Sequence, residues 1–171
     1  MKYVLTYGIL AGLIAISGLT AGIVFAGQHS LMFGYLIMLV ALTLVFVGVK
    51  RFRDVERGGV IKFLPAFAIG LAIAVVAAIA YVAGFEAYLA ATDYRFFDEF
   101  IADQMRQQQA AGLTGAALAA KAAEFEDMRV IFQNPLARMG MTAIEILPVG
   151  FLVALVSAAL LRNPRFLRSA G

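Results

Sequence analysis

Apolar and polar positions alternate in long blocks along this chain. Four apolar stretches, at residues 3–26, 31–49, 63–89 and 139–161, are each close to or longer than the roughly 20 residues that a helix needs to cross a bilayer core. The pattern therefore predicts four transmembrane helices. Residues 24–26 have the small-residue spacing of a signal-peptide cleavage site, but we expect the first stretch to be retained as a span.

The long connection between the third and fourth stretches has helical periodicity of its own. It predicts a helix over residues 93–111, capped by Thr92 or Asp93 and ended by Gly112, and a second helix over 115–133, capped by Thr114. Apolar residues fall on one face of the second helix, namely Leu118, Ala122, Phe125, Met128 and Phe132. These faces need a cover, which can be the other helix of a hairpin, the lipid surface or a partner; we expect packing within the chain or its oligomer.

Asn134 and Pro135 mark the start of the last helix, as its N-cap and first residue. The fold class expected is an all-α integral membrane protein, with four transmembrane helices plus an extracytoplasmic amphipathic helical hairpin between the third and fourth. Residues 1–171 then form a single membrane domain, because the length leaves no room for a second domain of ordinary size.

Composition supports the membrane class. The chain is 63% hydrophobic and 15% charged, whereas soluble domains are roughly half apolar and about a quarter charged. It contains no cysteine, which excludes disulfides and thiolate metal sites.

The charges are distributed unevenly over the two sides of the predicted membrane domain. The side with both termini and the connection after the second span carries nine basic and two acidic residues, whereas residues 90–138 carry five basic and seven acidic ones. Positively charged loops remain in the cytoplasm, so we expect both termini inside and the long connection outside a bacterial inner membrane. The basic loop is then a topological anchor or, alternatively, a site for anionic lipid headgroups.

Small residues recur at helical spacing in the first and third stretches. Such stripes let helices approach closely in lipid. They predict packing inside a four-helix bundle or, alternatively, a homo-oligomer interface; the positions singled out are Gly8, Gly12, Gly18, Gly22 and Gly70.

Glu145 is the most unusual residue of the apolar stretches, because it lies about two turns inside the last one. A carboxylate there is costly unless it faces protein or water and finds a partner. Glu86 lies near the same side of the membrane, Arg138 is on nearly the same helix face, and Pro148 frees the backbone carbonyl of Ile144. These residues predict a polar site. It is either a cluster of mutually satisfied polar groups that stabilises the fold or a functional site. We expect Glu145 to be protonated and hydrogen bonded rather than paired with Arg138.

Other chemistry has little support in the sequence. We identify no catalytic motif, cofactor-binding loop or metal site; the lone His29, on the same outer side as Glu86, Asp93 and Glu145, would make a weak carboxylate–imidazole site at most. Nucleic-acid binding has no support beyond the net charge, which the membrane topology already explains.

Four segments together resemble a known family. They are GVKRFRDVERGGVIKF (residues 48–63), GFEAY (84–88), NPLAR (134–138) and EILPVG (145–150), and they resemble the bacterial membrane family catalogued as domain of unknown function 4199. The resemblance implies a four-pass integral membrane protein of bacteria. It implies no activity, so no catalytic residue is transferred.

Three classes of function fit these observations. The first is a non-enzymatic membrane module (an assembly, scaffold or accessory subunit) whose outer helices contact a second copy or a membrane-protein partner. The second is a small proton- or cation-coupled transporter or channel component that uses Glu145 and Glu86. The third is an intramembrane or lipid-modifying enzyme, which is disfavoured because one histidine and no cysteine leave few acid–base groups.

Overall fold

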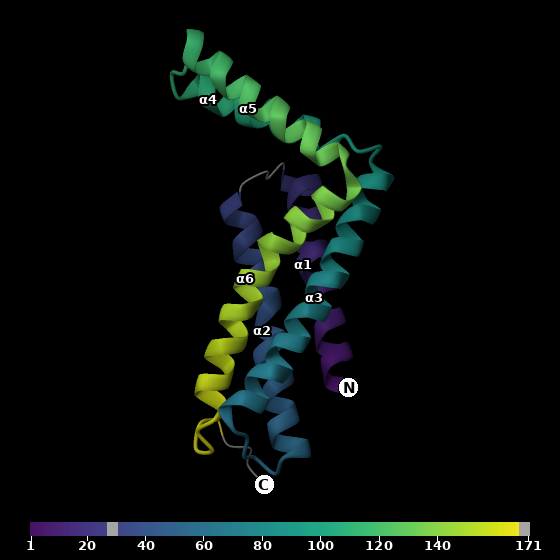
Figure 1. Ribbon diagram of the computed structural model, residues 1–171, viewed down its shortest axis with the longest axis vertical. Coiled ribbons are helices and arrows are strands. Elements are labelled where there is room, and N and C mark those ends of the chain that lie inside the picture. The colour runs from purple at the N-terminus through teal and green to yellow at the C-terminus, as the bar shows by residue number, and fades with distance from the viewer. Residues whose placement is uncertain (27–30, 168–171) are drawn as a thin grey trace. The chain divides into compact units, whose positions relative to one another are not determined.

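A computed structural model describes residues 1–26 and 31–167, and this part of the chain is all-helical (Figure 1). Its helices are, in order, α1 Lys2–Ala26, α2 Leu31–Glu56, α3 Phe63–Ala91, α4 Phe96–Ala110, α5 Gly115–Gln133 and α6 Pro135–Leu161. The predicted all-α class is confirmed. His29 lies outside the described residues.

Four of these helices are long and apolar enough to cross a membrane: α1, α2, α3 and α6. Only 28–33% of the residues in their most apolar windows are buried inside the protein. Many large apolar side chains of these helices are exposed, for example Leu36, Leu64 and Ile144, as lipid-facing residues are in a membrane protein. The prediction of four helices able to span is confirmed.

Two helix boundaries differ from the prediction. α2 continues through the basic segment to Glu56 instead of ending near residue 49, because that segment contains no helix breaker before Gly58. α4 begins at Phe96 instead of residue 93, because Asp93 and Tyr94 have positive φ angles of 52° and 56°. The Thr92 hydroxyl caps no helix start; it donates to the carbonyl of Tyr88 at 2.9 Å, in the last turn of α3.

The other helix ends agree with the sequence. Gly112 follows α4 with a φ of 89°, a conformation that glycine adopts without strain. Thr114 is the N-cap of α5, although its side chain makes no capping hydrogen bond. The Asn134 side-chain oxygen accepts hydrogen bonds from the backbone N–H groups of Leu136 and Ala137 at 3.0 and 3.3 Å. This N-cap, with Pro135 as the first helical residue, starts α6 as predicted.

The chain divides into two compact units. Unit 1 comprises Met1–Gly84 and Ala143–Gly171, and unit 2 comprises Phe85–Thr142. Unit 1 contains α1, α2, most of α3 and most of α6. Unit 2 contains all of α4 and α5, together with the last turns of α3 and the first turns of α6. The single membrane domain over residues 1–171 stays a prediction.

Glycines bring the helices of unit 1 into backbone contact. A Cβ placed on Gly12 of α1 would lie 2.5 Å from the carbonyl oxygen of Ala77 in α3, and one on Gly8 would lie 2.6 Å from Val76. Gly18 and Gly22 of α1 face Ile37 and Phe33 of α2.

A second set of close contacts involves α6. A Cβ on Gly70 of α3 would lie 3.1 Å from Ala154 of α6, and one on Gly150 of α6 would lie 2.8 Å from Ala74 of α3. All five glycines singled out in the sequence therefore lie at helix–helix contacts inside the chain.

We expect Gly12→Leu to destabilise the protein by about 3 kcal/mol, because its side chain would collide with the backbone of α3, which cannot move aside as a side chain can. The apparent melting temperature in detergent measures this effect. Gly140→Leu is the matched control, since a Cβ on Gly140 would meet nothing within 4 Å. Equal melting temperatures for the two variants would contradict the contact.

Candidate functional site

Arg138, in the second turn of α6, is the most completely bonded side chain of unit 2. It is 5% exposed. Its Nε and Nη2 donate to the two carboxylate oxygens of Glu86 at 2.8 and 2.6 Å, and its Nη1 donates to the carbonyl of Phe132 at 2.8 Å. The two parallel hydrogen bonds to one carboxylate make the strong bidentate form of an ion pair. This pair fixes the last turns of α3 to the first turns of α6 within unit 2.

Asp93 and Tyr94 form a strained turn beside this ion pair. Non-glycine residues rarely have positive φ, and two in succession need support from their surroundings. The Tyr94 backbone N–H donates to the carbonyl of Leu89 at 2.8 Å. The Tyr94 ring lies 5.1 Å from the guanidinium carbon of Arg138, a cation–π contact. Strain of this kind often accumulates where a side chain is positioned for binding.

α4 and α5 pack on each other through an aromatic and an ionic contact. The rings of Phe97 and Phe132 are stacked with centroids 4.2 Å apart. Beside them, Nη2 of Arg129 donates to Asp98 at 2.5 Å, and Nη1 donates to Glu126 at 3.4 Å. The Nε of Arg129 is buried and has no hydrogen-bond partner. A buried N–H without an acceptor is rare and costly.

These groups surround a cavity of about 500 Å³, which we call the hairpin pocket. It is lined by Leu89, Asp93, Tyr94, Phe97, Asp98, Arg129, Phe132, Gln133, Pro135 and Arg138. All of these residues belong to unit 2. The pocket combines aromatic and aliphatic side chains with charged and amide ones in similar measure.

Glu145 belongs to unit 1 and is half-buried in α6. Within residues 1–26 and 31–167 its carboxylate makes no hydrogen bond or ion pair, although the buried Tyr81 is close enough for an electrostatic interaction. α6 continues through Pro148 as a helix. Hydrogen bonding of a protonated Glu145 stays a prediction.

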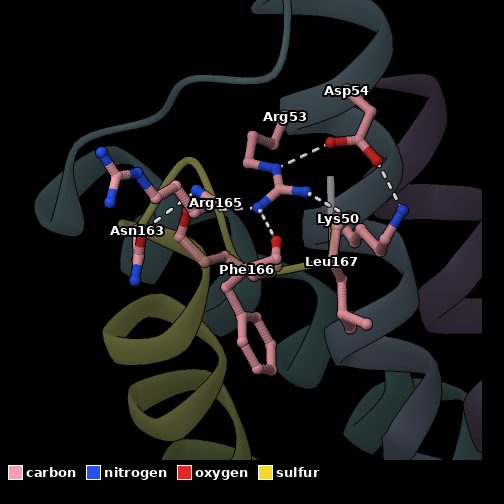
Figure 2. Close-up of polar contacts among 8 residues, drawn as sticks. Lys50, Arg53, Asp54, Asn163, Arg165, Phe166 and Leu167 are labelled. Carbon is pink, nitrogen blue, oxygen red and sulfur yellow. Dashed lines mark hydrogen bonds and ion pairs between the residues drawn. The ribbon is translucent and has the colours of Figure 1, made fainter. Parts of the chain in front are cut away.

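A second polar cluster of unit 1 holds the end of α6 (Figure 2). Arg53 of α2 is 0% exposed; its Nη1 donates to the carbonyl of Phe166 at 2.9 Å and its Nη2 to that of Leu167 at 3.0 Å. Its Nε donates to Asp54 at 2.7 Å, and Asp54 also accepts a hydrogen bond from Lys50 at 2.6 Å. Arg53 therefore ties the segment after α6 to α2.

The structure brings together only part of the predicted polar site. Glu86 and Arg138 form one ion pair, whereas Glu145 and Pro148 lie in the other unit. Nothing in the spacing of the sequence singles out Arg129 or Tyr94 as site residues. Only Arg129 has a feature in the sequence that could have indicated its place: it lies one helical turn before Phe132, at the end of the apolar face of α5. No group of three or more metal-ligating side chains occurs in residues 1–26 or 31–167.

Comparisons with known proteins place the chain in a family without assigning an activity. Neither the curated proteins nor the solved structures contain a match to it. A family model matches residues 6–163, which include all of α2 to α6, nearly all of α1, and every residue of the hairpin pocket. The chain belongs to the family described as "Protein of unknown function (DUF4199)".

Proposed function

We propose that this protein is a non-enzymatic, multi-pass module of the bacterial inner membrane, with both termini in the cytoplasm and unit 2 outside. In this role it is an accessory or assembly subunit that contacts a second copy of itself or another membrane protein through unit 2. The observation that carries the proposal is the hairpin pocket, whose walls are held by two ion pairs, Arg138–Glu86 and Arg129–Asp98. A fixed pocket of this kind is suited to binding.

The length of the connection between α3 and α6 also supports recognition. A short loop is enough to join two neighbouring spans, but this chain builds two further helices there. α5 has no buried residue, so most of its surface is available for contact with a partner. Binding functions concentrate on such connections because the spanning helices hold them in place.

The charge distribution supports the proposed orientation. The acidic and basic residues of unit 2 number eight and five, whereas the α2–α3 turn and the segment after α6 are rich in lysine and arginine. Basic segments remain on the cytoplasmic side.

The transporter alternative is supported by fewer structural observations. Arg138 holds Glu86 in a bidentate ion pair, which leaves Glu145 as the acidic side chain that could carry a proton or cation. A single half-buried carboxylate in a span is equally suited to a structural role.

Single-cysteine variants test the proposal cleanly, since the chain has no cysteine of its own. We expect Ala119→Cys, on the exposed face of α5, to react with a membrane-impermeant maleimide in intact spheroplasts. A maleimide–diazirine reagent attached at the same position should then give a discrete protein adduct after illumination, either with a second copy or with another membrane protein.

Val60→Cys is the matched control, because Val60 is exposed in the turn between α2 and α3. It should react only after the membrane is permeabilised. The reverse labelling pattern would disprove the orientation. Correct labelling of Ala119→Cys without any protein adduct would disprove the accessory role.

A further inference from the structure

We propose that an anionic phospholipid binds where the start of α3 meets the end of α6, with its phosphate held by Lys62 and Arg162. The two cations lie at the same end of one helix–helix contact, and no acidic side chain pairs with them there. Both residues belong to unit 1, so the proposal goes beyond the proposed function, which concerns contacts of unit 2. It narrows the alternative of a lipid-binding basic loop to one defined site.

Small residues form the contact between α3 and α6, which we call the α3–α6 seam. A Cβ on Gly70 would lie 3.1 Å from the side chain of Ala154, and one on Gly150 would lie 2.8 Å from that of Ala74. One turn further along each helix, a fully buried alanine continues the contact. The seam therefore consists of Ala66, Gly70 and Ala74 of α3 and of Gly150, Ala154 and Ala158 of α6.

Lys62 and Arg162 continue the two sides of this seam by one more turn. Residues four apart lie on the same face of a helix, and Lys62 precedes Ala66 as Arg162 follows Ala158. Backbone hydrogen bonds keep both positions in helical register: the N–H of Ala66 donates to the carbonyl of Lys62, and the N–H of Arg162 donates to that of Ala158, each at 3.1 Å. Because the two helices run in opposite directions along the seam, this turn brings Lys62 level with Arg162.

Both side chains can reach a single phosphate group. Packed helices lie about 8–10 Å apart, axis to axis, and small residues permit the closest approach. Arg162 is fixed in place, because Arg53 binds the carbonyls of Phe166 and Leu167 in the segment that follows it (Figure 2). A guanidinium and an ammonium that converge in this way match the oxygens of a phosphate.

The acidic residues of unit 1 are not available to balance these two cations. Asp54 and Glu56 already bind other basic side chains at the end of α2 and in α1. Glu145 lies roughly 25 Å from Arg162 along α6. Lys62 and Arg162 make no hydrogen bond or ion pair within the described part of the chain. Two like charges placed level with each other repel, and a shared anion removes this repulsion.

The position of the site favours a lipid over a soluble anion. The candidate spans begin at Phe63 and end at Leu161, directly beside the two cations. Side chains at the ends of spans lie among lipid headgroups, and basic sites between the ends of adjacent spans bind anionic headgroups. Leu64 is 73% exposed and Phe151 45% exposed, and the ring of Phe151 packs edge-on against Phe67 at a centroid distance of 5.4 Å. These side chains offer an apolar surface beside the seam for an acyl chain.

Native mass spectrometry of the purified full chain tests the proposal. The protein is incubated with equal amounts of phosphatidylglycerol, phosphatidylethanolamine and phosphatidylcholine that carry identical acyl chains. We expect phosphatidylglycerol to bind about tenfold more tightly than the other two, because two cations attract a net negative headgroup and repel the ammonium of the zwitterionic lipids. The double variant Lys62→Gln with Arg162→Gln should abolish this preference.

The matched control is the double variant Arg51→Gln with Arg57→Gln. It removes the same charge from exposed positions of the same end of unit 1, but outside the seam. We expect it to keep the preference for phosphatidylglycerol. An equal loss in both double variants would show that general surface charge attracts the lipid, and would overturn the site.

A cross-link tests whether the two positions lie level with each other. The chain has no cysteine of its own, so Lys62→Cys with Arg162→Cys places the only two thiols in the protein. A short bismaleimide should join them within one molecule, as a mass increase of one linker with both thiols consumed. Two separately modified thiols without a bridge would contradict the placement on which the site depends.

Two further outcomes would overturn the proposal. One is equal binding of the three lipids to the unmodified protein. The other concerns the source of the headgroup: soluble glycerophosphoglycerol should bind far more weakly than the lipid, and equally tight binding would show that the ligand is a soluble phosphate ester. These measurements use purified protein, so failure of the proposed orientation or of the accessory role in cells would leave their outcome unchanged.

Discussion

Glu86→Ala is expected to destabilise the protein by about 3–5 kcal/mol, because it leaves the guanidinium of Arg138 buried without a counter-ion. Removing one partner of a buried ion pair costs more than the pair itself contributes, since the remaining charge keeps its desolvation penalty. The apparent melting temperature in detergent, combined with chemical unfolding of the same preparation, measures the loss.

The control for Glu86→Ala is Glu99→Ala, which removes an exposed carboxylate of α4 and should change stability by less than about 0.5 kcal/mol. The double variant Glu86→Leu with Arg138→Leu should recover much of the lost stability, because it removes both charges and fills the space. If the double variant is as unstable as Glu86→Ala, the unpaired charge of Arg138 is not the cause of the lost stability, and this explanation is wrong.

Arg53→Ala is expected to cost a similar amount, about 3–5 kcal/mol. The substitution removes the donors to the carbonyls of Phe166 and Leu167 and one cationic partner of Asp54. It also leaves a cavity, because the Arg53 side chain is fully buried. Thermal unfolding in detergent measures the loss, and limited trypsin digestion at Arg165 should become faster as the segment after α6 is released.

Two variants separate the hydrogen-bond geometry of Arg53 from its charge. Arg53→Lys keeps a cation but cannot donate to two carbonyls and a carboxylate at once, so we expect a smaller loss than with alanine. Arg51→Ala removes an exposed neighbour and should leave both the melting temperature and the digestion rate unchanged. If Arg51→Ala accelerated digestion as much as Arg53→Ala, general charge and not the buried hydrogen bonds would hold the segment.

The helices could be predicted from the sequence because their signals are local. An apolar block longer than a bilayer core, a glycine after a helix and an Asn-Pro pair before one act over a few residues. The start of α4 was predicted wrongly because Thr92 and Asp93 are good capping residues in isolation. In the structure the Thr92 hydroxyl bonds to α3 instead, and Asp93 enters a strained turn in which the ring of Tyr94 contacts Arg138, a residue distant in the sequence.

The polar contacts depend on which elements become neighbours, and the sequence does not encode this locally. Glu86 and Arg138 were both singled out, but their pairing follows from the adjacency of the α3 and α6 ends within unit 2. Arg53 looked the same as Arg51 and Arg57, since all three fit a cytoplasmic anchor. Only the packing of α2 against the segment after α6 distinguishes the buried arginine from the exposed ones.

The glycine contacts between α1 and α3 determine how these helices can move. Gly8, Gly12 and Ile16 of α1 meet Val76, Ala77 and Gly84 of α3 in the same order, so the two helices run parallel with matched small positions. Sliding α1 by one turn, about 5.4 Å, would bring either Val4 or Ile16 to a place where only glycine fits. A piston motion of α1 along α3 by one turn is therefore blocked, and a rearrangement that changes the α1–α3 register would first have to separate the two helices.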